Sequence, residues 1–368
     1  MDSFHDDISF IILNFLSLEE ATCLRQVNRN FLDMVRRNIW RVPAFQCFDL
    51  EKWRLCFPFA RTIGYNSPRI KDISEYLHPQ LEHVQVCNCL VGGALFLHLH
   101  TLSLPFCLNV TGDIFKNLVG LTYLNVTYCT DFEGGALLGL TNLKTLIADN
   151  CGQLQDEHFK TLQNLQMLNV GGCELWGDFV CGKKLKWLQI PDTLIHSDIF
   201  KHLNGLEYLD APCAIISQQS FYAAASTLTS VNLDYVELNS FELVYMPNLK
   251  KASLRGTKFS TLRAFKMAKW FDLTDAWLDG IRDLRGSLDY LDVTGGIYKS
   301  PHFLTNLDYI DVLISYNCEF NAKVFQFCPL VRFWSVGCHI LEVLDQEQIC
   351  AKMKTEFVES CHQDMCYC

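Results

Sequence analysis

Apolar residues recur along most of the chain in one pattern, leucine-x-x-leucine-x-leucine-x-x-cysteine, whose places are numbered one to nine. Places one, four and six are apolar in twelve of thirteen copies, the exception being Ser335 in the last. Because 49% of the residues are apolar, a single random site matches about one time in eight, and only the run of copies is informative. The copies begin, 18 to 23 residues apart, at Leu81, Leu99, Leu121, Leu143, Leu165, Leu185, Leu206, Leu228, Leu249, Ala268, Leu288, Leu307 and Leu330.

A weaker copy at Ala60, Ile63, Tyr65 and Pro68 keeps the spacing, and we expect it to open the array, since terminal units of repeat arrays are atypical. Each unit is predicted to form one short strand that is completed by its neighbours. The pattern therefore predicts an α/β fold with a curved parallel sheet. The repeats are short, so the convex side has room only for short helices or 3₁₀ turns, for example over 113–118 and 158–162.

Place nine holds a cysteine in six copies, and its side chain should point inward. A buried thiol acts there as a small hydrophobe with a weak donor that reaches a backbone carbonyl. A metal site at Cys87 and Cys89 is the alternative, but two such residues alternate to opposite faces of a strand, so no metal is expected. The six are Cys89, Cys107, Cys129, Cys151, Cys173 and Cys338.

The repeated pattern resembles the leucine-rich repeat, in particular its cysteine-containing form. That resemblance implies a leucine-rich-repeat solenoid. Its units are shorter here than in the longer cysteine-containing form. After Cys338 the pattern stops, and Leu341, Leu344, Met353 and Phe357 recur at helical intervals. We expect a helix there that closes the open end of the array.

Residues 1–45 lack the pattern and are predicted to form helices. Seven of the nine residues from Ile8 to Leu16 are strongly apolar and none is charged, so this helix must be covered on several sides. A capping box at Ser17 and Glu20 opens a second helix, and a third includes Phe31. A segment of about 40 residues rarely buries enough surface to fold alone. Its apolar surface meets either the neighbouring repeats or a partner protein.

The same region contains, in order, Phe-His-Asp-Asp-Ile at 4–8, Ile-Leu-Asn-Phe-Leu at 12–16, Arg-Gln-Val-Asn-Arg-Asn-Phe at 25–31 and Ile-Trp at 39–40. It resembles an F-box, with His5 where that family usually has proline. Together the two motifs resemble the F-box/leucine-rich-repeat proteins. The resemblance implies a non-catalytic substrate receptor of an SCF-type cullin-RING ubiquitin ligase. It places the contacts to the Skp-type adaptor among Ile8, Ile12, Leu13, Phe15, Leu16, Leu24, Val27 and Phe31.

Places three, five and seven alternate away from the core and should line the concave sheet. They form an aromatic and acidic strip that suits a protein target presenting Lys or Arg. Alternatively, the aromatic rings stack on their neighbours and steady the sheet, with the acids as solvated surface. Exchanging Asp272 and Asp292 for lysine is expected to weaken target capture without unfolding the chain. The strip comprises Tyr123, Trp187, Tyr208, Asp210, Asp234, Trp270, Asp272, Tyr290, Asp292, Tyr309 and Asp311.

One stretch approaches an enzyme motif. Residues 177–184 come close to a phosphate-binding P-loop, but Lys184 stands where Ser or Thr should hold magnesium. A loop between repeats is the preferred interpretation, and an ATPase rests on this stretch alone. The sequence thus predicts no catalytic residue, metal or other cofactor. If the chain acts in ubiquitin transfer, its contribution is the proximity of a tethered target to chemistry on other subunits.

Charge and terminal composition set the remaining expectations. The chain of 368 residues carries 31 Lys and Arg against 41 Asp and Glu, a net charge of -10, which disfavours nucleic-acid and anionic-membrane partners. Asp2, Asp6 and Asp7 stand where a secretory signal has basic residues. We therefore expect an intracellular protein, in the cytoplasm or nucleus, that keeps its 18 cysteines reduced.

The expected organisation is an F-box over 1–45, a connector with the opening cap over 46–80, repeats over 81–340, and a capping helix with tail over 341–368. The competing function is a non-ligase scaffold that uses its repeats to hold or sequester a protein partner, with the N-terminal helices only as a cap.

Overall fold

A computed structural model describes most of the repeat region and parts of the N-terminal helices. The described residues are 16, 20, 21, 23, 25–26, 29–37, 49–92, 96–180, 183–195, 199–214, 218–236, 245–258, 262–276, 284–298, 304–320 and 330–340. The chain divides into two compact units, Met1–Leu185 and Lys186–Cys368. None of the helices in the described ranges has the length and apolar character that crossing a membrane requires.

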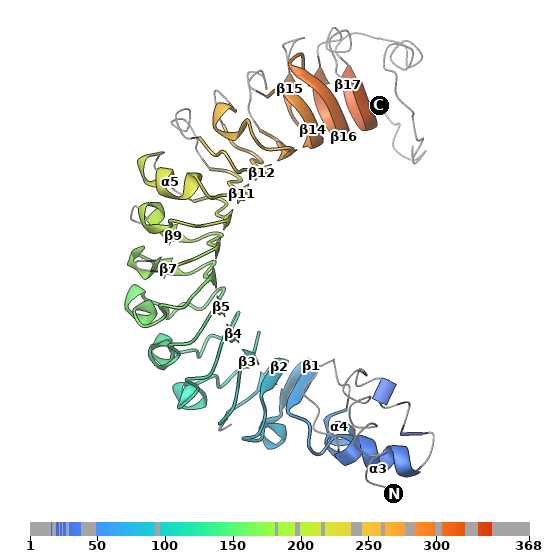
Figure 1. Ribbon diagram of the computed structural model, residues 1–368, viewed down its shortest axis with the longest axis vertical. Helices are drawn as coiled ribbons and strands as arrows, with labels where there is room; N and C mark the ends of the chain where they lie inside the picture. The colour runs from blue at the N-terminus through green and yellow to red at the C-terminus, as the bar shows by residue number, and fades with distance from the viewer. Residues whose placement is uncertain are drawn as a thin grey trace, which may run out of the picture. The chain divides into compact units, whose positions relative to one another are not determined.

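The first unit combines N-terminal helices, of which α3 (Arg29–Arg37) and α4 (Leu50–Cys56) are described in full, with a parallel sheet whose strands pair in chain order (Figure 1). Short 3₁₀ helices lie on the side opposite the sheet, as the repeat length predicts. The paired strands are β1 (Thr62–Asp72), β2 (His83–Leu90), β3 (Thr101–Ser103), β4 (Tyr123–Asn125), β5 (Thr145–Ile147) and β6 (Met167–Asn169). The remaining elements are η1 (Ser74–Tyr76), η2 (Gly112–Phe115), η3 (Gly134–Gly139), η4 (Asp156–Phe159), β7 (Glu174–Leu175) and η5 (Asp178–Val180).

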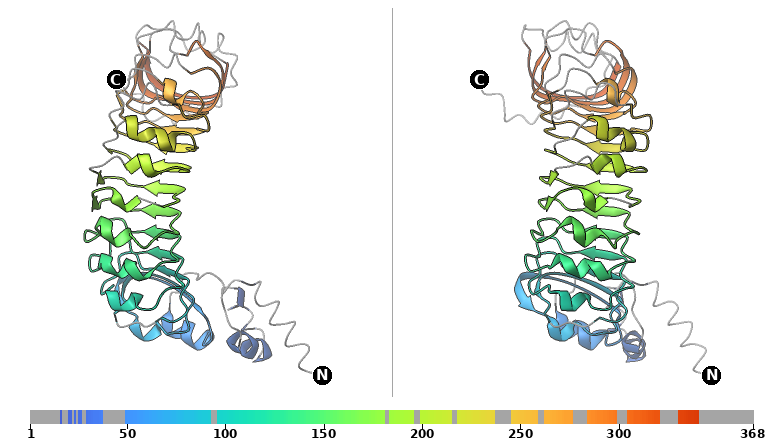
Figure 2. Two further views of the ribbon diagram at one scale, coloured as in Figure 1. Left: turned by 60° about the vertical axis from the view of Figure 1, so that its left-hand side comes forward. Right: turned by 90° about the vertical axis from the view of Figure 1, so that its left-hand side faces the viewer.

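The second unit continues the same plan, and every pairing described in it is parallel. Its last long strands, orange in Figure 2, extend well beyond the three-residue strands that precede them. The main sheet contains β8 (Trp187–Gln189), β10 (Tyr208–Asp210), β11 (Ser230–Asn232), β12 (Lys251–Ser253), β13 (Trp270–Asp272), β14 (Gly286–Asp292), β15 (Ile297–Tyr298), β16 (Leu307–Phe320) and β17 (Leu330–Ile340). The other elements are β9 (Leu194–Ile195), η6 (Ile199–His202), α5 (Gln218–Ala225) and η8 (Arg263–Phe265).

The buried core follows the repeat pattern. Leu121, Leu124 and Val126, at places one, four and six of one copy, are each 0% exposed. Strand register places Leu124 opposite Leu102 on one side and Leu146 on the other, so equivalent places stack from repeat to repeat. This stacking confirms the copies from Leu81 to Leu288, apart from the step between the two units, whose relative placement is not described.

The opening copy is also present. Ile63 lies opposite Val84, which is place four of the next copy, and Ala60 and Tyr65 are buried with it. Pro68, expected at the inward ninth place, is exposed. The neighbouring Ser67 is buried instead, because the strand register shifts after Asn66.

The starts predicted for the last two copies, Leu307 and Leu330, are wrong. Leu288 lies opposite Ile310, not Leu307, and Leu291 lies opposite Leu313. The true copy therefore begins three residues later. Its place six is Ser315 and its place nine is Cys318, both 0% exposed.

The final copy moves by one residue. Ile310 lies opposite Val331 and Leu313 opposite Trp334, so the copy begins at Val331 rather than Leu330. Its places one, four and six are then all apolar, and the exception at Ser335 disappears. Both errors arose because β16 and β17 contain apolar residues in several spacings, and only the backbone hydrogen bonds select the register.

Buried thiols link successive repeats as predicted. Each donates to the carbonyl at place six of the preceding copy: Cys129 Sγ lies 2.9 Å from the Leu104 oxygen and Cys151 Sγ 3.0 Å from the Val126 oxygen. Burial raises the pKa of the Cys129 and Cys151 thiols to about 12, so both remain protonated donors at neutral pH. Equivalent bonds are made by Cys107, Cys173 and Cys318. The ten cysteines whose side chains the structure describes are free, and no three described His, Cys, Asp or Glu side chains form a metal cluster.

Place eight has a left-handed backbone in every repeat described from β2 to β16. Such a conformation suits Gly, Asn and Asp and strains bulky side chains. The position ends each strand and turns the chain toward the next repeat. The residues are Asn88, Phe106, Tyr128, Asn150, Gly172, Asp192, Cys213, Tyr235, Gly256, Asp275, Gly295 and Asn317.

The N-terminal segment is described in part. The helix predicted to include Phe31 is α3, whose Val35 is buried. Helix α4 was not foreseen in the connector; Asp49 begins it by accepting a hydrogen bond from the Lys52 N–H (3.0 Å), and Leu50 and Trp53 are buried. The helix predicted after residue 341 lies outside the described residues.

We expect Cys151→Ala to lower the free energy of unfolding by about 1–3 kcal/mol, because it opens a small cavity and removes one of the two described donors to the Val126 carbonyl, which keeps only the Cys129 N–H. Cys213→Ala is the matched control, since that thiol is exposed, and should change the value by less than about 0.5 kcal/mol. Urea unfolding followed by circular dichroism measures both. Equal losses would contradict a structural role for the thiol at place nine.

Candidate functional site

The strand face of the second unit carries two stacked aromatic pairs at place three. The rings of Trp187 and Tyr208 are 3.5 Å apart between centroids and 14° from parallel. Those of Trp270 and Tyr290 are 4.8 Å apart and 9° from parallel. All four side chains are half-buried. Four of the predicted aromatic residues therefore lie on this face, and their rings stack on their neighbours as the alternative interpretation expected.

Two intervening strands separate the pairs. Ser230 and Lys251 occupy place three between Tyr208 and Trp270, with each residue directly opposite the next. Three strand spacings of ~4.8 Å put the two pairs roughly 14 Å apart. The face thus offers two separate aromatic platforms rather than one continuous row.

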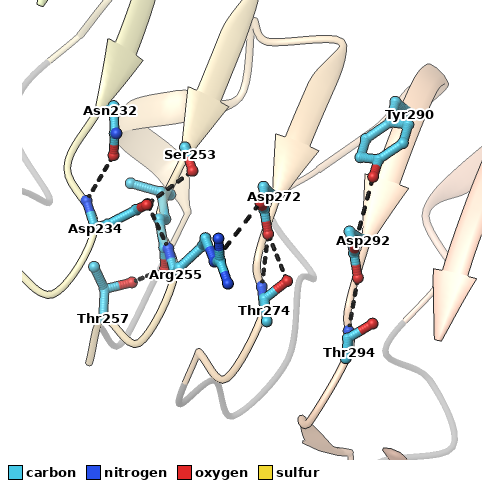
Figure 3. A network of polar contacts seen from close by, with 11 residues as sticks. Asn232, Asp234, Ser253, Arg255, Thr257, Asp272, Thr274, Tyr290, Asp292 and Thr294 are labelled. Atoms are coloured by element: carbon cyan, nitrogen blue, oxygen red, sulfur yellow. Dashed lines mark hydrogen bonds and ion pairs between the residues drawn. The ribbon is translucent and has the colours of Figure 1, made fainter. Parts of the chain in front are cut away.

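Aspartates at place five lie beside each platform and also hold the strand ends. Asp272 Oδ1 accepts hydrogen bonds from the Thr274 N–H (3.0 Å) and hydroxyl (2.7 Å), and Asp292 Oδ1 accepts one from the Thr294 N–H (2.9 Å; Figure 3). These Asx turns satisfy the backbone where the strand ends. One oxygen of each carboxylate is therefore committed to the fold.

The first platform contains unpaired polar atoms. Asp210 Oδ2 accepts a hydrogen bond from Gln189 Nε2 at 3.0 Å. Asp210 Oδ1 and Trp187 Nε1 are buried and have no hydrogen-bond partner in the described part of the chain. Buried polar groups without partners are costly. An incoming molecule that supplied a donor and an acceptor here would remove that cost.

A network of charged residues occupies the gap between the platforms (Figure 3). Asp234 Oδ1 accepts hydrogen bonds from the Ser253 hydroxyl (2.7 Å) and the Arg255 N–H (2.9 Å). Arg255 Nε lies 3.9 Å from Asp272 Oδ2. Burial raises the pKa of the Asp234 carboxyl, and the two hydrogen bonds oppose this shift. Asp234 is thus part of a structural network and less available to a partner than Asp210.

The Tyr290 hydroxyl lies 3.4 Å from Asp292 Oδ2. Burial, with the negative charges of Asp292 and Asp272, raises the pKa of Tyr290 to about 12. The phenol therefore remains a donor at neutral pH and orients the second oxygen of Asp292.

Sequence reasoning missed a row of basic residues on the same face. Lys186, Lys250 and Lys269 occupy place two and are exposed, as is Lys251 at place three. Lys186 pairs with Glu207 at 2.9 Å. Aligning the residues at place two of all copies would have revealed this row of lysines in the sequence. The face is therefore polarised, with lysines at the strand starts and aspartates at the strand ends.

Three predicted residues are not part of this site. Tyr123 lies on β4 in the first unit, half-buried. Because the repeat starts at Ile310, Tyr309 and Asp311 leave places three and five, which Val312 and Ile314 occupy instead. Asp311 accepts a hydrogen bond from the Tyr309 hydroxyl (3.0 Å) and pairs with Arg332 (3.1 Å).

The residues assigned to the adaptor are described only in part. Leu16 is half-buried, and Phe31 belongs to α3. Ile8, Ile12, Leu13, Phe15, Leu24 and Val27 lie outside the described residues.

The stretch that resembles a P-loop is placed between β7 and β8. It includes the 3₁₀ helix η5, and Lys183, the residue at the lysine place of that motif, is only 6% exposed. Cys181 and Gly182 lie outside the described residues.

Similar folds occur among solved structures. A complex of TLR13 with ssRNA13 matches with a TM-score of 0.54 and 14% identity, over 86% of this chain and 60% of that one. An internalin (inlF) from Listeria monocytogenes matches with a TM-score of 0.49 and 14% identity, over 93% and 95% of the two chains. The present chain thus spans only 60% of the TLR13 chain. No protein-family model matches the sequence, and no curated protein is significantly similar to it.

The class of the protein follows from the repeat register together with the TLR13 match. The chain has a leucine-rich-repeat, solenoid-like fold built on a parallel sheet with few helices. At 14% identity the likeness concerns the fold alone.

The Asx turns revise the expected effect of lysine at Asp272. Asp272→Lys removes the acceptor for Thr274 and should cost about 0.5–2 kcal/mol of unfolding free energy, whereas Asp272→Asn keeps an oxygen acceptor and should cost less than about 0.5 kcal/mol. The exposed Asp289 undergoes the same charge change in the control Asp289→Lys, with little expected effect. Thermal unfolding compares the three. Equal stability of both Asp272 variants would show that the turn contributes nothing.

Proposed function

We propose that the chain is a non-catalytic receptor that binds a basic, extended segment of a partner protein on the strand face between Trp187 and Asp292. The observation that carries the proposal is the pair of aromatic platforms, each with an aspartate beside it. Cations bind over aromatic faces and pair with carboxylates. The unpaired atoms of Asp210 and Trp187 support a ligand at the first platform.

The spacing of the platforms defines the partner further. An extended chain rises about 3.3 Å per residue, so a separation of roughly 14 Å is spanned by about four residues. Two basic side chains at i and i+4 also point to the same face of an extended segment. Lys251 and Arg255 between the platforms favour an acidic residue between the two basic ones.

We expect an extended peptide with arginines at i and i+4 and a central glutamate to bind at least tenfold more tightly than its isomer with arginines at i and i+2, because only the first reaches both platforms. Fluorescence anisotropy with labelled peptides measures both affinities. Asp272→Asn combined with Asp292→Asn should weaken the first peptide by about fivefold or more.

Asp289→Asn is the matched control and should leave peptide affinity unchanged, because this acid lies outside the strip. Affinity that is the same for both peptides would refute the spacing. Absence of binding by either peptide would refute the receptor itself.

The N-terminal region supports a more specific role, as the substrate-recognition subunit of an SCF-type ubiquitin ligase. The support is the resemblance of residues 4–40 to an F-box, whose apolar residues would dock a Skp-type adaptor and through it a cullin-RING ligase. In that role the chain tethers its target at high effective concentration near chemistry on other subunits. Free cysteines in the described ranges suit the proposed location in the cytoplasm or nucleus.

A protein target is preferred over nucleic acid. The TLR13 structure contains an RNA, but the net charge of -10 in the present chain opposes phosphate backbones. The second candidate function is a scaffold that holds a protein partner without a ligase. The same strand face supports both functions, so the N-terminal residues discriminate between them.

Ile12→Lys combined with Leu16→Lys should abolish recovery of a Skp-type adaptor and a cullin in affinity purification, because charge is introduced into the apolar contact. Target recovery through the strand face should persist in the same sample. Recovery of the target without adaptor or cullin by the unsubstituted chain would establish the scaffold instead.

A further inference from the structure

We propose that the stacked rings of Phe106 and Tyr128, at the strand ends of the first unit, form a second binding surface that takes an arginine side chain of a partner protein. The surface belongs to place eight, not to the strand-face strip, and it lies in the other unit. The proposal can therefore be tested independently of the platforms at Trp187 and Trp270.

The two rings form an exposed, ready-made stack. Their centroids are 4.8 Å apart and their planes differ by 9°. Phe106 and Tyr128 are each 47% exposed. Large apolar side chains that remain this exposed together, instead of packing inward, are typical of contact surfaces.

The backbone under the rings is unfavourable for these residue types. Phe106 has φ 58° and Tyr128 has φ 56°, and aromatic residues rarely adopt this left-handed conformation. Most other repeats place Asn, Asp or Gly at the same position, as Asn88 and Asn150 do on either side of the pair, although Cys213 and Tyr235 also occupy it. The turn therefore does not require an aromatic residue. Strain retained where a relaxed alternative exists points to a role for the rings themselves.

A carboxylate lies between the loops that carry the rings. Asp131 accepts a hydrogen bond from the Asn109 N–H at 3.1 Å, so its carboxylate joins the two loops that carry the rings. Glu133, two residues after Asp131, is also exposed. This arrangement favours a positively charged ligand.

Arginine fits this surface better than lysine. Its planar guanidinium stacks on aromatic faces, and its donors form a fork that matches a carboxylate such as that of Asp131. Lysine offers only a compact charge without a plane. The surface is thus expected to select arginine from a basic segment.

The test uses the full chain and a labelled peptide of three Arg-Gly-Ser units, with a peptide of three Lys-Gly-Ser units for comparison. Asp210→Asn, Asp272→Asn and Asp292→Asn form the background, so that the strand-face strip is weakened throughout. Phe106→Asn combined with Tyr128→Asn should lower the affinity for the arginine peptide at least tenfold. The unfolding temperature should stay unchanged or rise, because asparagine relaxes the left-handed turn.

Two further variants separate a binding role from a structural one. Phe106→Leu combined with Tyr128→Leu keeps apolar bulk but removes the planar faces, and should lower affinity to a similar extent. Tyr235→Asn relaxes the same kind of turn in the second unit, where Tyr235 is 56% exposed with φ 59°, and should leave affinity unchanged.

Several results would overturn the proposal. They are unchanged affinity in the asparagine variant, full affinity in the leucine variant, equal affinity for the lysine peptide, and no binding by the background chain. A clear fall in unfolding temperature in the asparagine variant would also overturn it, by making the stack a structural ladder.

Discussion

The fold depends on one constraint: each strand must meet the next in a single register while its apolar places stay buried. Leucines at places one, four and six fill the interior, and the backbone hydrogen bonds between strands fix which residues lie side by side. The thiol at place nine joins each repeat to the carbonyl of the one before. A shift of one residue would turn every core side chain to the surface. The register therefore decides the surface as well as the core.

The candidate binding face follows from that register. Tyr208, Ser230, Lys251 and Trp270 stand in line only because four strands pair without a shift. The aspartates beside them serve two purposes, since Asp272 and Asp292 hold strand ends with one oxygen and face the strip with the other. Replacing one of these aspartates therefore changes both the charge of the face and the stability of the strand end that carries it.

Much of the fold could be predicted from the sequence, because burial selects Leu, Val and Ile at fixed places. The pattern failed at β16, where Leu307, Ile310 and Val312 satisfy it as well as Ile310 and Leu313 do. The spacing of apolar residues contains no information on the backbone hydrogen bonds that determine which of the two registers forms. For that reason Tyr309 and Asp311 were assigned to the strip, whereas Asp311 pairs with Arg332.

The site was predictable in composition but not in its contacts. The order Asp-x-Thr at Asp272 and Asp292 is a signal for an Asx turn, and the lysines at place two form a visible column. The residue type of Phe106 and Tyr128 does not indicate a left-handed backbone, because aromatic residues seldom adopt it. Only their position at place eight, which is Asn, Asp or Gly in most repeats, indicates it.

The central claim is that the strand face from Trp187 to Asp292 receives the partner. Hydrogen–deuterium exchange of the full chain, with and without the peptide that has arginines at i and i+4, tests it without any substitution. The account predicts slower exchange on peptide addition in segments from 185 to 294 and unchanged exchange over β1 and β2. Protection confined to other segments, or no protection with the peptide bound, would contradict it.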